Sequence, residues 1–169
     1  MQSEAEQAFQ DYVSSRWNAL VRTAYLLTGD RHLAEDLVQS TLAKAYRSWP
    51  RVRRGGDPDA HVRRMLVTCH HDRFRRTRVA EHLTDVPPER TTEQDDMARA
   101  DERHVLARAL ADLPKRQRTV VVLRYWEDLS EAEVARTMGC SVGTVKSQSA
   151  KALAKLRNRL GPSRLTPTG

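Results

Sequence analysis

Residues 140–160, CSVGTVKSQSAKALAKLRNRL, bring together lysines, arginines, a glutamine and short hydroxyl side chains, and none of them is acidic. Lysine and arginine neutralise phosphates, hydroxyl groups hydrogen-bond to them, and glutamine or lysine can reach the edges of bases. The whole chain of 169 residues shares this bias, with 29 Lys and Arg against 22 Asp and Glu and a net charge of +7. The chemistry that suits these residues is binding of a polyanion, either nucleic acid or an anionic membrane surface.

The residues before this stretch predict how it is positioned. Ser130 followed by Glu133 is a capping box, which starts a short helix. Gly139 suits a tight turn and Ser141 can cap the next helix, so about three residues join the two helices. This arrangement predicts a helix-turn-helix, a motif whose second helix enters the major groove of DNA.

Helical periodicity divides the second of these helices into two faces. Val145, Ala152 and Leu156 fall on the side that would pack inward. The opposite side carries the candidate DNA-binding residues, which are Thr144, Ser147, Gln148, Lys151 and Lys155, with Lys146 at the flank. The alternative is a solvated basic surface helix, but the capped helix and glycine turn upstream favour DNA binding.

The rest of the chain also has helical patterns. Apolar residues between Phe9 and Leu27 recur every three, four or seven positions, which predicts a long amphipathic helix that ends at Gly29. A second helix is expected to end at Pro50, and residues 51–59, with two glycines and a proline, to form a loop. The run TVVVL at 119–123 would favour a strand if read alone, but its flanks favour a buried helix. We therefore predict an all-α protein.

The third predicted helix is basic on one side. Asp57 can cap it, and Pro58 suits its first position. Residues 61–78 include six arginines and one acidic residue, while the apolar side chains form only a narrow stripe. One face is expected to pack, and the opposite face, with Arg64, Arg75, Arg78 and His71, to be positive.

The composition changes sign after this helix. Residues 81–103 carry eight acidic residues, two adjacent prolines and almost no large apolar side chain, a pattern typical of a linker. We expect two small helical domains at 1–80 and 101–160, joined by a flexible acidic linker at 81–100. A disordered tail is expected at 161–169.

Other classes of protein fit the sequence less well. A signal peptide and a membrane-spanning apolar run are both missing, which predicts a cytoplasmic protein without membrane contacts. Cys69, His70 and His71 are consecutive, so on a helix they cannot converge on one metal ion. Without a nucleophile motif or phosphate loop, we expect neither an enzyme nor a cofactor. Aromatic residues are only 5% of the chain, which argues against an RNA reader that stacks bases.

Three stretches of the chain carry a resemblance to a known family. They are LTGDRHLAEDLVQSTLAKAYRSW, AHVRRMLVTCHHDRFRRTR and LPKRQRTVVVLRYWEDLSEAEVARTMGCSVGTVKSQSAKALAKLR. In that order they resemble the core-binding helix, the promoter-melting helix and the sigma-4 helix-turn-helix of bacterial extracytoplasmic-function sigma factors. The resemblance implies an alternative sigma factor, with a sigma-2-like and a sigma-4-like domain, that directs core RNA polymerase to promoters.

The resemblance also implies which residues meet the polymerase. In such proteins the second helix docks on the β′ clamp helices, and the polymerase β flap is a further partner. The implied core-binding residues are Asp30, Glu35, Asp36, Leu37 and Gln39. The family usually has an acidic residue where this chain has Ser40.

The resemblance also implies that each domain contacts a different promoter element. The sigma-2-like domain would open the −10 element and capture an unstacked base. Its implied DNA contacts are Arg51, Arg53, Arg54, His61, Arg63, Arg64 and Arg75. The sigma-4-like helix would read the −35 element with Thr144, Ser147, Gln148 and Lys151 toward the bases and Lys146 and Lys155 nearer the phosphates.

Two questions stay open. A stand-alone helix-turn-helix regulator would explain residues 101–160 equally well, but it leaves the core-binding-like helix and the arginine-rich helix without a role. An anti-sigma factor is a common partner in the family, and nothing in these residues identifies one.

Overall fold

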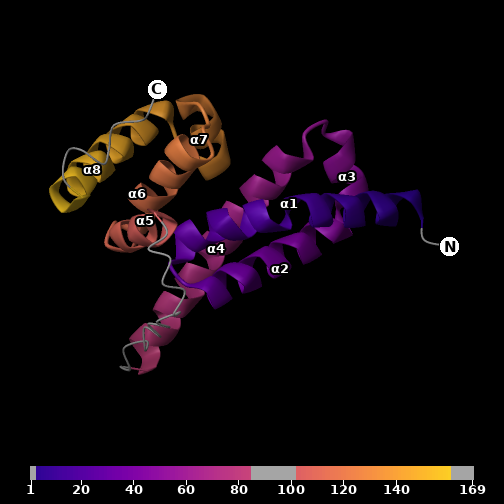
Figure 1. The fold of residues 1–169 in the computed structure, drawn as a ribbon, viewed down its shortest axis with the longest axis horizontal. Helices are drawn as coiled ribbons and strands as arrows, with labels where there is room; N and C mark the ends of the chain where they lie inside the picture. The colour runs from indigo at the N-terminus through magenta and orange to yellow at the C-terminus, as the bar shows by residue number, and fades with distance from the viewer. Residues whose placement is uncertain (1–2, 85–101, 161–169) are drawn as a thin grey trace.

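Helices make up every element in residues 3–84 and 102–160, the part of the chain that this computed structural model describes (Figure 1). The all-α prediction is confirmed. The N-terminal helices are α1 (Glu4–Thr28), α2 (Arg31–Arg47), α3 (Trp49–Arg54) and α4 (Pro58–Thr84). The C-terminal helices are α5 (Glu102–Ala111), α6 (Lys115–Val121), the π-helix η1 (Val122–Trp126), α7 (Glu131–Met138) and α8 (Val142–Leu160). Among these described helices, none has the length and apolar character to span a bilayer.

Helices α1 and α2 form a hairpin whose ends are fixed by local capping. Ser3 and Glu6 make a capping box at the start of α1. Gly29 ends that helix with a φ of 74°, a left-handed conformation that costs glycine little. Asp30 then caps α2 by accepting a hydrogen bond from the Leu33 amide at 2.9 Å. The short connection lays the two helices side by side, and their facing sides form a shared apolar core.

Helix α3 occupies residues 49–54, so the expected loop at 51–59 is wrong for its first part. Pro50 lies in the first turn of α3, where a missing amide leaves no hydrogen bond unmade. Trp49 holds this short helix in place, because its buried ring lies 5.2 Å from the rings of Phe9 and Tyr12 in α1. The irregular backbone is limited to residues 55–57.

Helix α4 has two packed sides. Its start is capped as predicted, with Asp57 Oδ1 accepting from the Ala60 amide at 3.1 Å. Leu66 packs into the core of α1 and α2, whereas Val67 belongs to a core formed mainly by the C-terminal helices. The backbone stays helical through residue 84, four residues into the segment expected as a linker. The remainder of that linker and the tail 161–169 lie outside the described residues.

The run TVVVL is helical, as predicted, and spans α6 and the start of η1. The widening into a π-helix is not predicted by the apolar pattern. It leaves Leu123 fully buried while Tyr125 and Trp126 are exposed. Single π turns of this kind occur often at functional sites.

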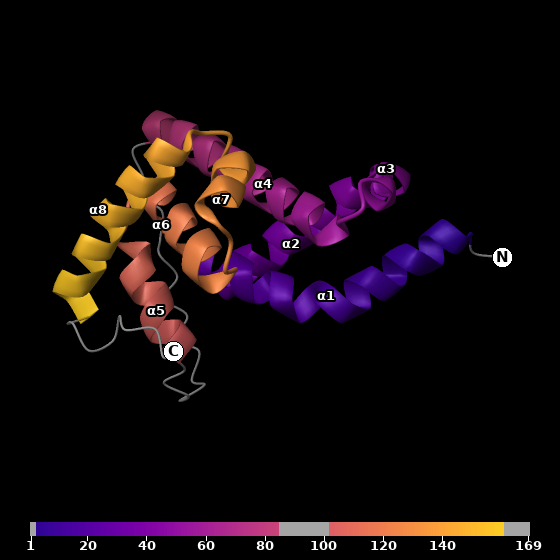
Figure 2. The same ribbon diagram turned by 90° about the horizontal axis from the view of Figure 1, so that it is seen from above.

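The N-terminal and C-terminal helices pack against each other. Helix α5 lies against α1 and helix α7 against α4 (Figure 2). One apolar core contains Leu20 and Leu27 of α1 together with Leu110 of α5 and Val121 of α6. The sequence predicts two helical domains, and the structure adds that their cores are continuous.

Candidate nucleic-acid interface

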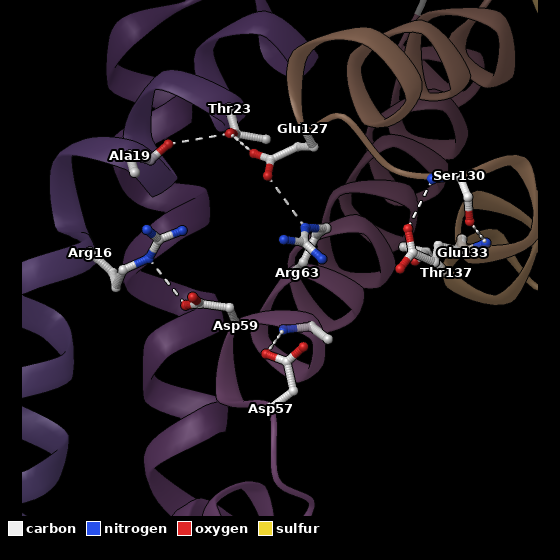
Figure 3. Close-up of polar contacts among 11 residues, drawn as sticks. Arg16, Ala19, Thr23, Asp57, Asp59, Arg63, Glu127, Ser130, Glu133 and Thr137 are labelled. Carbon is white, nitrogen blue, oxygen red and sulfur yellow. Dashed lines mark hydrogen bonds and ion pairs between the residues drawn. The ribbon is translucent and has the colours of Figure 1, made fainter.

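Helices α7 and α8 form the predicted helix-turn-helix, with residues 139–141 between them. The Ser130 side chain accepts from the Glu133 amide at 3.2 Å, and the Glu133 carboxylate accepts from the Ser130 amide at 2.8 Å (Figure 3). The backbone amide of Ser130 is the main reason that the pKa of Glu133 is lowered. Gly139 ends α7 with a φ of 67°, and Ser141 accepts from the Thr144 amide at 3.0 Å to start α8.

Helix α8 presents the predicted side chains away from its packed face. Val145, Ala152 and Leu156 are buried against the rest of the C-terminal domain. The candidate DNA-binding residues fall into an exposed group, Lys146, Ser147, Lys151 and Lys155, and a half-buried group, Thr144 and Gln148. With no acidic residue on α8, this face can meet a phosphate backbone without like-charge repulsion.

A shallow groove beside α8 adds residues that the sequence pattern missed. Arg124 and Tyr125 of η1 line it together with Lys146 and Ser149 of α8. The Tyr125 hydroxyl lies 3.3 Å from Ser149 Oγ, and the Arg124 guanidinium lies 5.6 Å from the Tyr125 ring centre. The π-helix brings this pair to α8, and no feature of the sequence predicts a π turn at this place.

The predicted polymerase-facing residues of α2 separate into surface and core. Asp36 and Gln39 are exposed, and Glu35 is half-buried with its carboxylate 3.6 Å from Arg31. Asp30 serves as the cap of α2. Leu37 is only 1% exposed and packs in the core, so its position in this structure is that of a packing residue and not of a surface contact.

Arg73 of α4 reaches the same side of α2. It donates hydrogen bonds to the Ser40 hydroxyl and, at 3.3 Å, to the Asp36 carbonyl. The arginine therefore lies beside the position where the sigma-like pattern usually has an acid. The sequence pattern treats Arg73 as one of several arginines, because a contact between residues so far apart leaves no local signal.

The basic residues expected at the −10 element lie on α3 and α4. Arg51, Arg53, Arg54, Arg64 and Arg75 are exposed, and His61 is half-buried. Three of these arginines stand on helix α3 instead of the expected loop, so the helix and not a flexible backbone positions them.

Arg63 differs from this group. Its Nε lies 3.4 Å from Glu127 Oε2, at the end of η1, and its side chain is 19% exposed (Figure 3). In this arrangement the guanidinium is already engaged by a carboxylate of the C-terminal domain. A DNA contact of Arg63 therefore stays a prediction that depends on this ion pair opening.

The middle of α4 meets α6 through polar groups. His71 Nε2 lies 3.3 Å from Thr119 Oγ1, and Lys115 Nζ donates to the His71 carbonyl at 3.1 Å. Burial lowers the pKa of His70 to about 3 and that of His71 to about 4, and the positive charge of Lys115 adds to both shifts. Burial also lowers the pKa of Lys115 to about 8. His71, expected on a positive open face, thus lies at the contact between the domains.

Comparison with known proteins matches both halves of the chain to one family. Family models described as sigma-70 region 2 and sigma-70 region 4 match residues 5–79 and 103–156. The chain is 38% identical over 152 residues to the RNA polymerase sigma-E factor of Streptomyces coelicolor, covering 90% of this chain and 85% of the relative. It is 31% identical over 156 residues to the ECF RNA polymerase sigma factor SigM of Mycobacterium tuberculosis, covering 91% and 78%.

Solved structures share the fold. The sigma factor RpoE of Bartonella quintana, solved with the anti-sigma factor NepR, has a TM-score of 0.73 at 24% identity and covers 91% of this chain and 97% of its own. CnrH, solved with the cytosolic domain of CnrY, has a TM-score of 0.62 at 27% identity and covers 91% and 88%. With a helix-turn-helix, two matching family regions and relatives that span most of the chain, the protein belongs to the sigma-70 family as an extracytoplasmic-function RNA polymerase sigma factor.

Proposed function

We propose that this sigma factor binds core RNA polymerase through α2, opens the −10 element with α3 and α4, and reads the −35 element with α8. The observation that carries this division is the presence, in one chain, of an exposed acidic and amide face on α2 and an acid-free recognition helix. A stand-alone regulator needs the second feature and has no use for the first.

The proposed polymerase contacts on α2 are Asp36 and Gln39, with Glu35 beside them. Exposed carboxylates and amides of this kind form directional contacts with a partner's basic and polar groups. Asp30 supports the surface by capping the helix that carries it. Leu37 supports it from the core, where it keeps α2 packed on its neighbours.

The proposed −35 contacts lie on α8. Thr144, Ser147, Gln148 and Lys151 would face bases, while Lys146 and Lys155 would lie nearer phosphates. Glutamine can pair with adenine at two positions and lysine can reach guanine, whereas phosphate contacts give affinity without sequence information. Arg124 and Tyr125 border this surface and are added to it as candidate backbone contacts.

The proposed −10 contacts are the exposed cations of α3 and α4. They comprise Arg51, Arg53, Arg54, His61, Arg64 and Arg75, and Arg63 joins them when it is released from Glu127. A row of cations on two rigid helices can hold the backbone of a separated strand.

The chemistry of transcription belongs to the polymerase in this proposal, and we assign no catalytic residue, cofactor or metal to the chain. Because its proposed partners are the polymerase and promoter DNA, we expect it to act in the cytoplasm. An anti-sigma factor is a further proposed partner, in line with the CnrH structure, in which a second protein, the cytosolic domain of CnrY, is bound.

The test is transcription by core RNA polymerase on a library of duplex promoters. Asp36→Arg should lower initiation by about tenfold or more, because it places a cation where the polymerase meets an acid. Asp11→Arg makes the same charge change at an exposed site on α1, outside the proposed surfaces, and should leave initiation unchanged. If the wild-type chain bound DNA alone and never supported initiation, the stand-alone regulator would replace this proposal.

A further inference from the structure

Glu127 connects the C-terminal domain to two helices of the N-terminal domain. One carboxylate oxygen lies 3.4 Å from Arg63 Nε on α4, and the other accepts a hydrogen bond from the Thr23 hydroxyl on α1 (Figure 3). Thr23 is 2% exposed, and the side chains of Arg63 and Glu127 are each 19% exposed. Water screens such a pair much less than an ion pair on an open surface.

Arg118 makes a second connection between the domains. Its Nη1 donates to the Leu27 carbonyl at 2.8 Å, in the last turn of α1. Two other nitrogens of the same guanidinium donate to the carbonyls of Leu110 and Ala111, each at 2.9 Å, in the last turn of α5. Carbonyls at the end of a helix have no partner within the helix, so one arginine satisfies acceptors from both domains at once.

Apolar packing covers α4 next to this ion pair. Val67, one turn beyond Arg63, is 2% exposed and packs with Val120 and Leu123 of the C-terminal domain. Val134 of α7, the first helix of the helix-turn-helix, belongs to the same core. One side of α4 is therefore closed to any other partner while the domains are together.

The position of the Glu127 carboxylate suggests its role. Carboxylate and phosphate oxygens are alternative partners for a guanidinium, because both accept hydrogen bonds and both are negatively charged. Arg63 lies next to the exposed Arg64, which belongs to the proposed −10 surface. A DNA phosphate that approached Arg63 would compete with Glu127 for the guanidinium.

We propose that the closed arrangement is an inhibited state of the free protein, in which Glu127 occupies Arg63 in place of a promoter phosphate and holds the two domains together. This inference rests on the proposed function, because it regulates the −10 surface assigned there. Release of Glu127 exposes Arg63 and the covered side of α4 together, so domain opening and −10 binding are coupled.

The test compares Glu127→Gln with Asp128→Asn in the full chain. The first change removes the charge but keeps a hydrogen-bond acceptor for Thr23. The second makes the same chemical change at the next residue, which is exposed and has a φ of 55°, a conformation that asparagine tolerates. Glu127→Arg serves as the stronger variant, because it places a second guanidinium beside Arg63 and the two positive charges repel each other.

Two readouts are needed, namely the radius of gyration from small-angle X-ray scattering and the affinity of the polymerase-free chain for single-stranded −10 DNA. The radius should increase from wild type to Glu127→Gln to Glu127→Arg, and Asp128→Asn should match wild type. Glu127→Gln should bind the strand about three- to tenfold more tightly, because a competing anion is gone.

Equal radii for all four proteins would overturn the closed inhibited state. A larger radius without tighter DNA binding would overturn the competition between Glu127 and phosphate. Failure of the wild-type chain to support initiation with polymerase would refute the sigma assignments, while the radius measurement would still decide whether Glu127 holds the domains together.

Discussion

Arg73 shows how one side chain can link two proposed binding surfaces. It stands on α4, which carries part of the proposed −10 surface, and donates to Ser40 and to the Asp36 carbonyl on α2, the proposed polymerase-binding helix. We expect Arg73→Ala to weaken binding to core polymerase about five- to thirtyfold, because a lost charged hydrogen bond costs about 1–2 kcal/mol. Binding of labelled core polymerase, measured by fluorescence anisotropy, checks this expectation.

The matched control for Arg73 is Arg76→Ala on the same helix. Arg76 is exposed and, within the part of the chain that the structure describes, has no hydrogen bond or ion pair to α2. Its substitution therefore removes the same charge without removing a contact to that helix. Equal affinities for the two variants would mean that only net charge matters and that Arg73 does not position α2.

For single residues, the sequence predicts contacts between positions that are close together along the chain. Ser130 and Glu133 are three positions apart, and the capping box that they form follows from residue types alone. Thr23 and Glu127 are 104 positions apart, so their contact depends on the packing of whole domains. Leu37 is a different case, because the structure buries it in the core while the family resemblance implies a contact with the polymerase.

The turn between α7 and α8 is the element on which the recognition surface depends. Gly139 has a φ of 67°, and an added Cβ would meet no atom within 4 Å. Gly139→Ala should therefore lower the free energy of unfolding by about 1–2 kcal/mol through backbone strain alone, with no steric clash. Urea denaturation followed by circular dichroism measures this change.

Gly143→Ala provides the comparison within the same motif. Gly143 lies in the first turn of α8 with ordinary helical backbone, and its new Cβ would lie 3.8 Å from Ser141 Oγ, an ordinary contact. It should raise the free energy of unfolding by roughly 0.5 kcal/mol, because alanine favours a helix over glycine. Loss of stability in both variants would show that the motif is sensitive to any added methyl group and not to the left-handed turn.

Elements with a repeated apolar pattern are predictable, and short irregular ones are not. The long helix α1 and the cap of α4 follow from spacing and from Asp57. Helix α3 is missed because two glycines and a proline suggest a loop, while its stability comes from Trp49 packing on distant aromatic rings. The π turn of η1 is missed because its apolar residues also fit an ordinary helix.

The closed arrangement of the whole molecule brings ionisable groups of two domains together. His70 faces Lys115 and Arg118 of α6 and lies beside His71 and Arg73 of α4. These groups are cations or bases, so a charge on His70 would be both buried and repelled. A buried histidine with such neighbours is held in its neutral form.

His71 is in a similar environment with one compensating charge. Lys115 and Arg116 of α6 and Arg75 of α4 disfavour its protonation, whereas Asp72 favours it. Burial is the largest cause, and the pKa falls to about 4. When the domains separate, both histidines should return toward the ordinary pKa of about 6.5.

The sign of the pH dependence follows from these lowered values. The closed state holds its histidines neutral, so its stability is complete above pH ~6.5 and is lost as pH falls through the window toward their closed-state pKa values. Lys115, with a pKa of about 8 when closed, adds stability only above that pH, because its neutral form is the one that burial favours. The stability of the closed arrangement should therefore be constant near neutral pH and decrease in mild acid.

Small-angle scattering between pH 7.5 and pH 5, with circular dichroism to monitor helix content, tests this window. The radius of gyration should increase below pH ~6.5 while the helix signal persists, since the domains separate before they unfold. His71→Asn should reduce the change, whereas His32→Asn, at an exposed site on α2, should keep it. A radius that stays constant until the helix signal is lost would show that the histidines affect folding of the domains and not their contact.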